Sequence, residues 1–520
     1  MNRFLNKIDV SDPSKLTLVI VILAMLIAAQ IQYIQHGWIN PDSVLYLESA
    51  RLISLGHWSA AFEVFNWPLY SACIAAIHKI SSLNIHHSAQ LLSVIFFGIT
   101  AFSFTKVIQL AGGNNRTIAA GGLILLSAQY LTGDILQMLL RDEGFWAFFL
   151  TSMVFFIRFY KTNRYLDAFY WQIFAILAVL FRIEAITYLI ALPLSLFFYQ
   201  QATFSQKVTQ FLKCNFLSII ALISIFAAIL MINSLTMTSF GRLNEVFTLN
   251  LWHQLTNQFF TKSAVMSSQV LGSYLDEFAV PGLLMTFAYV ILAKSIATTG
   301  IVNIGLAALT VKFRKNLIDS TVLYILTFAA VITLINSGLI ITKVFVLSGR
   351  YILALSLILM IVSAFYLAYL FQYFEIKQKK ATRKKWLVSG LIVLMLLGIV
   401  KNILPKQRGY NHMQEAVSWV KIHNTSNKPV FYDDTRARYY ANAPFIGTWP
   451  DNWMLVTDAI QTKQINQYDY LIINHSAKHP ERETYLAKEL IAFKIVNRYA
   501  TAKNKKSVVI YQKKHSPYSN

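Results

Sequence analysis

Charged residues and cysteines are both scarce in this chain of 520 residues. Only 13% of the residues are charged and 56% are hydrophobic, which leaves too little polar surface for a soluble globular protein. The two cysteines, Cys73 and Cys214, lie far apart in apolar surroundings, so neither a disulfide framework nor a thiolate metal site is expected. Composition therefore predicts a polytopic membrane protein in which both cysteines are packing residues.

The first long apolar run, Leu16 to Tyr33, follows a short basic tail with Arg3, Lys7 and Lys15. It is longer than the apolar core of a secretory signal and lacks a small-x-small cleavage site, so we expect a retained transmembrane helix. Ten further spans are predicted, at residues 89–110, 117–133, 143–160, 167–182, 183–199, 215–235, 281–311, 319–341, 350–373 and 386–404, with a break near Lys294. The sequence thus predicts an α-helical membrane domain over residues 1–404 with about eleven transmembrane helices.

Residues 166–200 are almost continuously apolar except for Arg182 and Glu184 at the centre. A single helix of this length would reach roughly 50 Å and would bury the charged pair at the middle of the bilayer. A hairpin of two short spans avoids both problems. Basic residues flank both ends of this segment, so the positive-inside rule places the Arg182/Glu184 turn on the outer face.

Charges of opposite sign fall on opposite sides of this predicted topology. Most basic residues before Pro405 lie in the segments assigned to the cytoplasmic side, and most acids lie at the outer side. Much of the formal charge of +22 is then a topology signal and an attraction to anionic membrane lipids. No nucleic-acid-binding motif accompanies it, so nucleic acid is not an expected partner. We expect an inner-membrane protein with a cytoplasmic N-terminus.

The first outer segment, Ile39 to Tyr70, carries Asp42, Glu48 and Glu63. Apolar residues at helical spacing predict two short helices on the membrane surface, over residues 42–55 and 68–80. Pro-Asp-Ser at residues 41–43 suits a helix N-cap, so Asp42 is either a capping residue or a functional acid. We expect Glu48 and Glu63 to be solvated or to lie at the membrane surface.

Further charged groups recur in the later outer segments. Asp134, Asp142 and Glu143 crowd a short loop, where they either complement a helix dipole or have a functional role. Residues 236–280 form a long loop with Arg242, Glu245, Trp252, His253, Tyr274, Asp276 and Glu277, and a loop of this length is expected to bind or gate. Arg350 and Tyr351 open the tenth predicted span, where an arginine could also serve as an interfacial anchor.

The order and common sidedness of these motifs resemble the GT-C superfamily of membrane glycosyltransferases. Within it the arrangement is most similar to glycosyltransferase family 39 and related groups, namely protein O-mannosyltransferases, lipid A aminoarabinose transferases and bacterial dolichyl-phosphate-mannose-type transferases. The resemblance covers about Leu16 to Gly398. It implies a sugar donor on a polyprenyl phosphate and transfer on the non-cytoplasmic face.

The resemblance also assigns roles to residues of this chain. The catalytic acid of the first loop falls on Asp42, followed by Ser43 where many relatives have a second acid. This gives a metal role no support, although a divalent metal stays possible, and no other cofactor is expected. The acid of the second loop falls on Asp142 or Glu143. The Arg-x-Glu motif matches Arg182 and Glu184, and the Arg-Tyr motif matches Arg350 and Tyr351.

Glycosyl transfer from a lipid phosphate needs these residue types. A carboxylate, here Asp42, takes the proton of an acceptor hydroxyl on a glycan, lipid or protein as that hydroxyl attacks the anomeric carbon. Guanidinium groups, here Arg182 and Arg350, stabilise the charge on the departing phosphate. A single displacement inverts the anomeric configuration. Asp142 or Glu143 would hold the acceptor or orient a basic residue, Glu184 and Tyr351 would orient the arginines, and the loop to Val280 would close over the donor.

Residues 405–520 alternate helical and strand-like patterns. Helices are predicted at 413–423 and 481–490 and between 434 and 469, and strands near 429–433, 470–473, 493–499 and 507–511, which together predict a small α/β domain. We expect it on the extracytoplasmic side in an accessory role in acceptor binding. Asp433, Asp434, His475 and His479 match no known ligand spacing, and turn or surface roles are expected for them.

Two other functions compete with transfer. A lipid-linked glycan flippase or other transporter would place charges along a path at the middle of the membrane. Here the charges gather at the outer rim and no inverted repeat is visible, which favours an enzyme. A glycan polymerase, which also acts on lipid-linked sugars, stays open as a third alternative.

Overall fold

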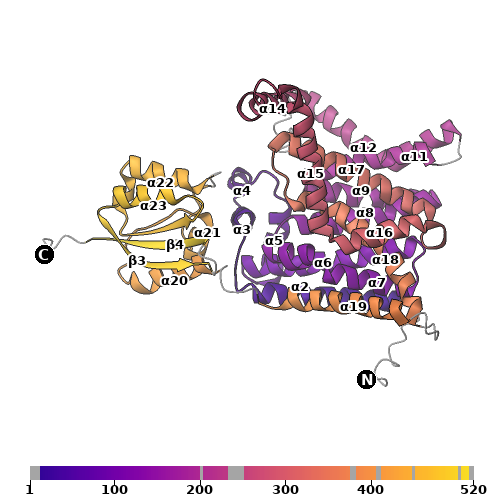
Figure 1. Cartoon of the computed structure of the whole chain (residues 1–520), viewed down its shortest axis with the longest axis horizontal. Helices are drawn as coiled ribbons and strands as arrows, with labels where there is room; N and C mark the ends of the chain where they lie inside the picture. Colours follow the sequence, from indigo (N-terminus) through magenta and orange to yellow (C-terminus); the bar gives the residue numbers. More distant parts are fainter. Residues whose placement is uncertain are drawn as a thin grey trace, which may run out of the picture. The chain divides into compact units, whose positions relative to one another are not determined.

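The computed structural model describes residues 12–199, 203–231, 251–374, 382–405, 411–447, 451–501 and 505–514 (Figure 1). The chain divides into two compact units. The first unit combines residues 1–33 with 87–404, and the second combines residues 34–86 with 405–520. The outer segment that carries Asp42 is therefore part of the same unit as the C-terminal residues.

The described residues of the first unit form helices and no strand. The main helices are α2 (Pro13–Ile34), α6 (Ile85–Leu110), α7 (Asn115–Ser127), α8 (Asp142–Thr162), α9 (Tyr165–Phe181), α10 (Ile186–Ala191), α11 (Ser195–Tyr199), α12 (Phe204–Met231), α14 (Leu251–Met266), α15 (Ala279–Thr299), α16 (Ile301–Lys312), α17 (Ser320–Val344), α18 (Leu353–Phe371) and α19 (Thr382–Ile403). Leucines such as Leu26 and Leu394 are exposed on them, as expected where lipid is the solvent.

Seven of the described helices are long and apolar enough to cross a membrane, or eight if the bent pair Asn115–Ser127 and Gln129–Met138 is one span. The other predicted spans coincide with α8 and with apolar helical segments of fewer than 18 residues, Tyr165–Phe181 and Ile183–Phe198. The predicted helical membrane architecture is confirmed. The predicted break near Lys294 is wrong, because Lys294 lies inside α15 and the chain breaks at Gly300, whose φ is +82°.

The first-loop helices of the second unit are α3 (Pro41–Ser54), α4 (Trp58–Val64) and α5 (Leu69–Ser81). Tyr46 on α3 joins them, because its buried ring meets Phe65 and Tyr70 edge to face at centroid distances of 5.0 and 5.4 Å. The two predicted helices are thus present. The short helix α4 between them was not predicted.

The C-terminal part of the second unit is an α/β sandwich around one sheet (Figure 1). Its strands β1 (Val430–Tyr432), β2 (Tyr470–Ser476), β3 (Phe493–Ala500) and β4 (Lys506–Lys513) lie in the order β1-β2-β4-β3, and only β1 and β2 are parallel. The helices are α20 (His412–His423), α21 (Thr435–Ala441), α22 (Asn452–Gln461) and α23 (Pro480–Glu489).

Both faces of this sheet are covered by helices. Leu471 and Ile473 of β2 pack with residues of α22 and α23 on one face, whereas Ile472 packs with residues of α20 and α21 on the other. A central strand buried on both sides explains the continuous apolar run at residues 470–473. The sheet and helices of this C-terminal part agree with those predicted, except that α21 and α22 occupy the segment where one helix was predicted.

Candidate active site

A cluster of buried charges forms where α8 begins and α9 ends. The guanidinium of Arg182 forms a direct ion pair with Asp142, and both side chains are at most 5% exposed. The Arg182 Nε also lies 3.3 Å from Glu184 Oε2. Arg182 is therefore held between two carboxylates, as expected because a buried charge needs partners of opposite sign. The structure thus brings together the Arg-x-Glu pair and an acid that lies 40 residues earlier.

Close packing of α8 against α9 makes this ion pair possible. Gly144 lies two residues after Asp142, and a Cβ at this position would overlap the ring of Phe181, the last residue of α9. Arg182 follows directly and has an extended backbone that ends the helix. Gly144 therefore lets the start of α8 and the end of α9 approach closely enough for Asp142 and Arg182 to form their ion pair.

The Arg-Tyr motif joins the same cluster from the 3₁₀ turn Gly349–Ile352 before α18. The ring of Tyr351 faces the Arg182 guanidinium at 4.4 Å, in a cation–π contact. The Nη1 atom of Arg350 lies 3.8 Å from Asp142 Oδ2. The Arg350 side chain is 24% exposed against 5% for Arg182, so Arg350 is the more accessible guanidinium.

Glu143 lies beside this cluster in a different environment. Its side chain is buried, and neither carboxylate oxygen accepts a hydrogen bond of ordinary geometry from the residues that the structure describes. Ser93 of α6 is a polar neighbour. Asp142 is therefore the acid of the pair that binds the arginines, whereas the Glu143 side chain is buried near Ser93.

Two residues of the cluster were not predicted. Tyr130 lies in the π-helical turn Gln129–Ile135, and its hydroxyl comes so close to Gly349 that a Cβ there would overlap it. Arg141 lies near enough to Glu184 to stabilise the negative charge of that carboxylate. Irregular π turns are frequent at functional sites.

Asp42 occupies the second residue of α3 in the other unit. The helix is capped by Asn40, whose side-chain oxygen accepts the Asp42 N–H at 3.0 Å, and Pro41 occupies the first turn as it commonly does. The alternative that Asp42 is the N-cap is therefore wrong. Asp42 is half-buried and Ser43 is fully buried. The other six predicted site residues belong to the first unit.

The remaining acids of the outer segments have local roles or lie elsewhere. Glu48 forms a two-pronged ion pair with Arg51 at 2.7 and 2.9 Å on α3, and Glu63 is exposed. Of the long loop at residues 236–280, Arg242 and Glu245 lie outside the described residues. Asp276 and Glu277 are exposed in a 3₁₀ turn before α15.

Asp433 and His475, for which turn or surface roles were predicted, are instead buried and hydrogen-bonded within the C-terminal part of the fold. Asn474 donates two hydrogen bonds of 2.7 Å to Asp433, whose burial, with the nearby Asp434 charge, raises its pKa to about 7. His475 bonds to Glu483 and Tyr511, and burial lowers its pKa. Among the described residues, no three His, Cys, Asp or Glu side chains gather in a way that could hold a metal ion.

Comparisons with known proteins give a structural likeness alone. No protein-family model and no curated protein sequence matches the chain. The crystal structure of ArnT from Cupriavidus metallidurans bound to undecaprenyl phosphate matches with a TM-score of 0.50 and 12% identity, covering 95% of this chain and 97% of that one. The archaeal oligosaccharyltransferase AglB from Archaeoglobus fulgidus, in complex with an inhibitory peptide and a dolichol-phosphate, gives a TM-score of 0.46 and 12% identity, covering 97% and 74%. The ArnT match shows a shared fold alone, and this fold agrees with the GT-C-like membrane fold that the sequence predicts.

Proposed function

We propose that this chain is a membrane glycosyltransferase that moves a sugar from a polyprenyl phosphate to an acceptor hydroxyl. The observation that carries the proposal is the pairing of Arg182 and Arg350 with Asp142 at the ends of apolar helices, where the ring of Tyr351 faces Arg182. The GT-C-like fold supports it, since ArnT, which shares this fold, was crystallised with undecaprenyl phosphate. A phosphate at the end of an apolar chain needs cations beside apolar helices, and this cluster supplies them.

The two arginines have different tasks in the proposed reaction. Arg350 is the more exposed arginine and its contact with Asp142 is long, so little free energy is lost when its side chain reorients to bind the donor phosphate. Arg182 is fixed by Asp142, Glu184 and the Tyr351 ring, and it supplies a fixed positive charge where the leaving phosphate gains negative charge. Asp142 thus orients the arginines.

Asp42 is the general base in this proposal. The acceptor oxygen attacks the anomeric carbon, its proton passes to the Asp42 carboxylate, and the bond from that carbon to the phosphate oxygen breaks. Polyprenyl phosphate leaves with the bonding electron pair, and a single displacement inverts the configuration. Asn40 supports this role, because it caps α3 and so holds the first turn that carries Asp42.

The proposed setting is the extracytoplasmic face of the inner membrane. The charge distribution along the sequence supports it through the positive-inside rule, with the N-terminus in the cytoplasm. The C-terminal α/β domain is then extracytoplasmic, and the acceptor is a glycan, lipid or protein that reaches this face.

Release of polyprenyl phosphate tests the proposal. Purified full-length protein is incubated with a set of radiolabelled polyprenyl-phosphate sugars and candidate acceptors, and free lipid phosphate is measured. We expect release, and Asp42→Asn should lower it about 10²- to 10⁴-fold, the usual contribution of a general base. Glu48→Gln is the matched control, since that acid of the same helix forms an ion pair with Arg51 on the same helix. Translocation of the lipid without release would establish a flippase and overturn the proposal, and normal turnover by Asp42→Asn would remove Asp42 from the mechanism.

A further inference from the structure

The first loop, residues 35–86 between α2 and the first turn of α6, is bound near both of its ends to the C-terminal domain by two consecutive tyrosines of α21. The hydroxyl of Tyr440 accepts a hydrogen bond of 2.9 Å from the backbone N–H of Ile39, where the loop leaves α2. The hydroxyl of Tyr439 is hydrogen-bonded at 3.0 Å to Nδ1 of His86, where the loop enters α6. These contacts lie within the second compact unit.

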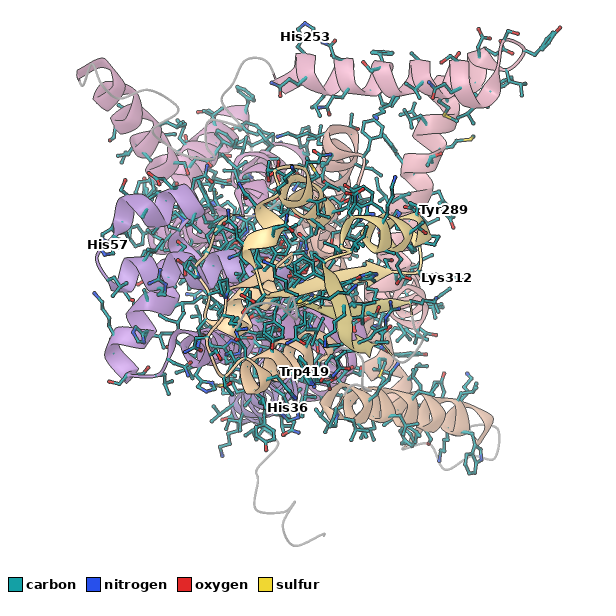
Figure 2. The ribbon with its side chains drawn as sticks, turned by 90° about the vertical axis from the view of Figure 1, so that its left-hand side faces the viewer. His36, His57, His253, Tyr289, Lys312 and Trp419 are labelled. Atoms are coloured by element: carbon teal, nitrogen blue, oxygen red, sulfur yellow. The ribbon has the colours of Figure 1, made fainter. Side chains whose placement is uncertain are left out.

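A third contact comes from the neighbouring helix α20. Gln414 donates a hydrogen bond of 3.2 Å to the backbone oxygen of His36, three residues before Ile39. In Figure 2, the labels of His36 in the first loop and of Trp419 on α20 lie close together in the lower half of the view. Ile39 itself is fully buried. The backbone that precedes α3 is therefore fixed at two points before the helix begins.

This fixed backbone leads directly to Asp42. Ile39 is followed by Asn40, whose side chain caps α3 and accepts the N–H of Asp42. Asp42 therefore lies three residues after Ile39, whose N–H donates to Tyr440, and belongs to the first turn of α3, which Asn40 caps. A change in the position of Ile39 is passed to the carboxylate through this short capped segment.

The helix that carries the tyrosines is itself fixed. Asp434 caps α21 by accepting the Arg436 N–H at 2.8 Å and also pairs with the Arg436 guanidinium at 2.7 Å. Lys421 of α20 donates a 2.7 Å hydrogen bond to the backbone oxygen of Tyr440. Ala437 is buried in the core between these helices and the sheet. The sheet, α20 and α21 thus present the two hydroxyls as a rigid surface.

We infer that the C-terminal domain is a positioning domain, in which Tyr440 sets the place of the Asp42 carboxylate through Ile39 and Asn40, and Tyr439 holds the other end of the loop. The inference rests on the proposed function of Asp42 as the general base. It gives the domain a task beyond acceptor binding. Displacement of a catalytic group by about 1 Å can cost on the order of 100-fold in rate, so loss of one positioning hydrogen bond affects turnover.

Tyr440→Phe tests this inference because it removes only the hydroxyl. Tyr499→Phe is the matched control: that hydroxyl accepts a hydrogen bond from Asn497 in β3. We expect Tyr440→Phe to lower kcat about 2- to 13-fold with an unchanged KM for the donor, as one hydrogen bond allows, and Tyr499→Phe to leave both unchanged. Hydrogen–deuterium exchange of residues 35–54 in the full chain should be faster in Tyr440→Phe and unchanged in the control.

Hydrogen–deuterium exchange tests the positioning role and turnover by Asp42→Asn tests the proposed base, so the two claims can fail independently. Unchanged exchange of residues 35–54 in both Tyr440→Phe and Tyr439→Phe overturns the positioning role, whatever Asp42→Asn does. Faster exchange with unchanged kcat also overturns it, since the loop then moves without consequence. Normal turnover by Asp42→Asn refutes the proposed base, while the exchange result still decides whether the domain holds the loop.

Discussion

Replacing Arg182 by glutamine should strongly destabilise the membrane unit. The change keeps much of the side-chain length and removes the charge between Asp142 and Glu184, which leaves two carboxylates with less compensation in a buried place. Removing one partner of a buried ion pair costs about 3–5 kcal/mol. Arg350 lies 3.8 Å from Asp142 and compensates part of the loss, so we expect about 3 kcal/mol, the lower end of that range.

Thermal denaturation in detergent, followed as loss of the monodisperse protein peak, measures this effect. Arg350→Gln is the matched control: this arginine is more exposed, and its loss should cost less than about 1 kcal/mol. Combining Arg182→Gln with Asp142→Asn should recover much of the stability, because the uncompensated charge is removed as well. Equal destabilisation by the two arginine variants, or no recovery in the double variant, would refute the argument that burial decides the cost.

Other changes test the remaining features. Arg350→Gln should lower kcat/KM for the lipid donor about 10- to 150-fold, the value of a charge-assisted hydrogen bond, while a steady-state assay of an unaffected variant such as Glu48→Gln serves as reference. Asn40→Ala should cost about 1 kcal/mol of helix stability and speed hydrogen exchange at the start of α3, and equal exchange would deny it the capping role. Because the pKa of Asp433 is raised to about 7, the stability it contributes is full below about pH 4 and is lost as the pH rises through 7. Thermal melting between pH 4 and 8 should show this slope, and Asp433→Asn should flatten it. Gly144→Ala should separate α8 from α9 and lower the melting temperature, as its Cβ meets a ring.

Element boundaries could be read from the sequence because apolar runs mark them. The four C-terminal strands and the helices α20 and α23 lie where they were predicted, and α9 ends at Phe181, directly before the charged pair that signalled a turn. In both cases burial decides the structure, and the local pattern of apolar residues predicts which residues are buried. The break predicted at Lys294 was wrong because a membrane helix can accommodate a lysine near its end. The helix ends instead at Gly300, whose positive φ is incompatible with a helix.

Pairings over long distances in the chain could not be read in this way. The sequence placed Asp142, Arg182 and Arg350 on one face, but the pairing itself depends on Gly144 letting two helix ends approach. The capping residue of α3 was misassigned, since Asn and Asp are both good caps and only the backbone geometry chooses between them. Contacts of the first loop with α20 and α21 had no local signal at all.

The hydrogen bond from Ile39 to Tyr440 joins residues 401 positions apart, and this separation orders events during synthesis. The first loop leaves the ribosome early, whereas its partner tyrosine is made only after every helix of the membrane unit. The bond between Ile39 and Tyr440 therefore forms only after α21 has been made. A chain that stops before α21 inserts its apolar helices but leaves Asp42 without the surface that positions it. Synthesis of α21 is thus the step on which the inferred positioning of Asp42 depends.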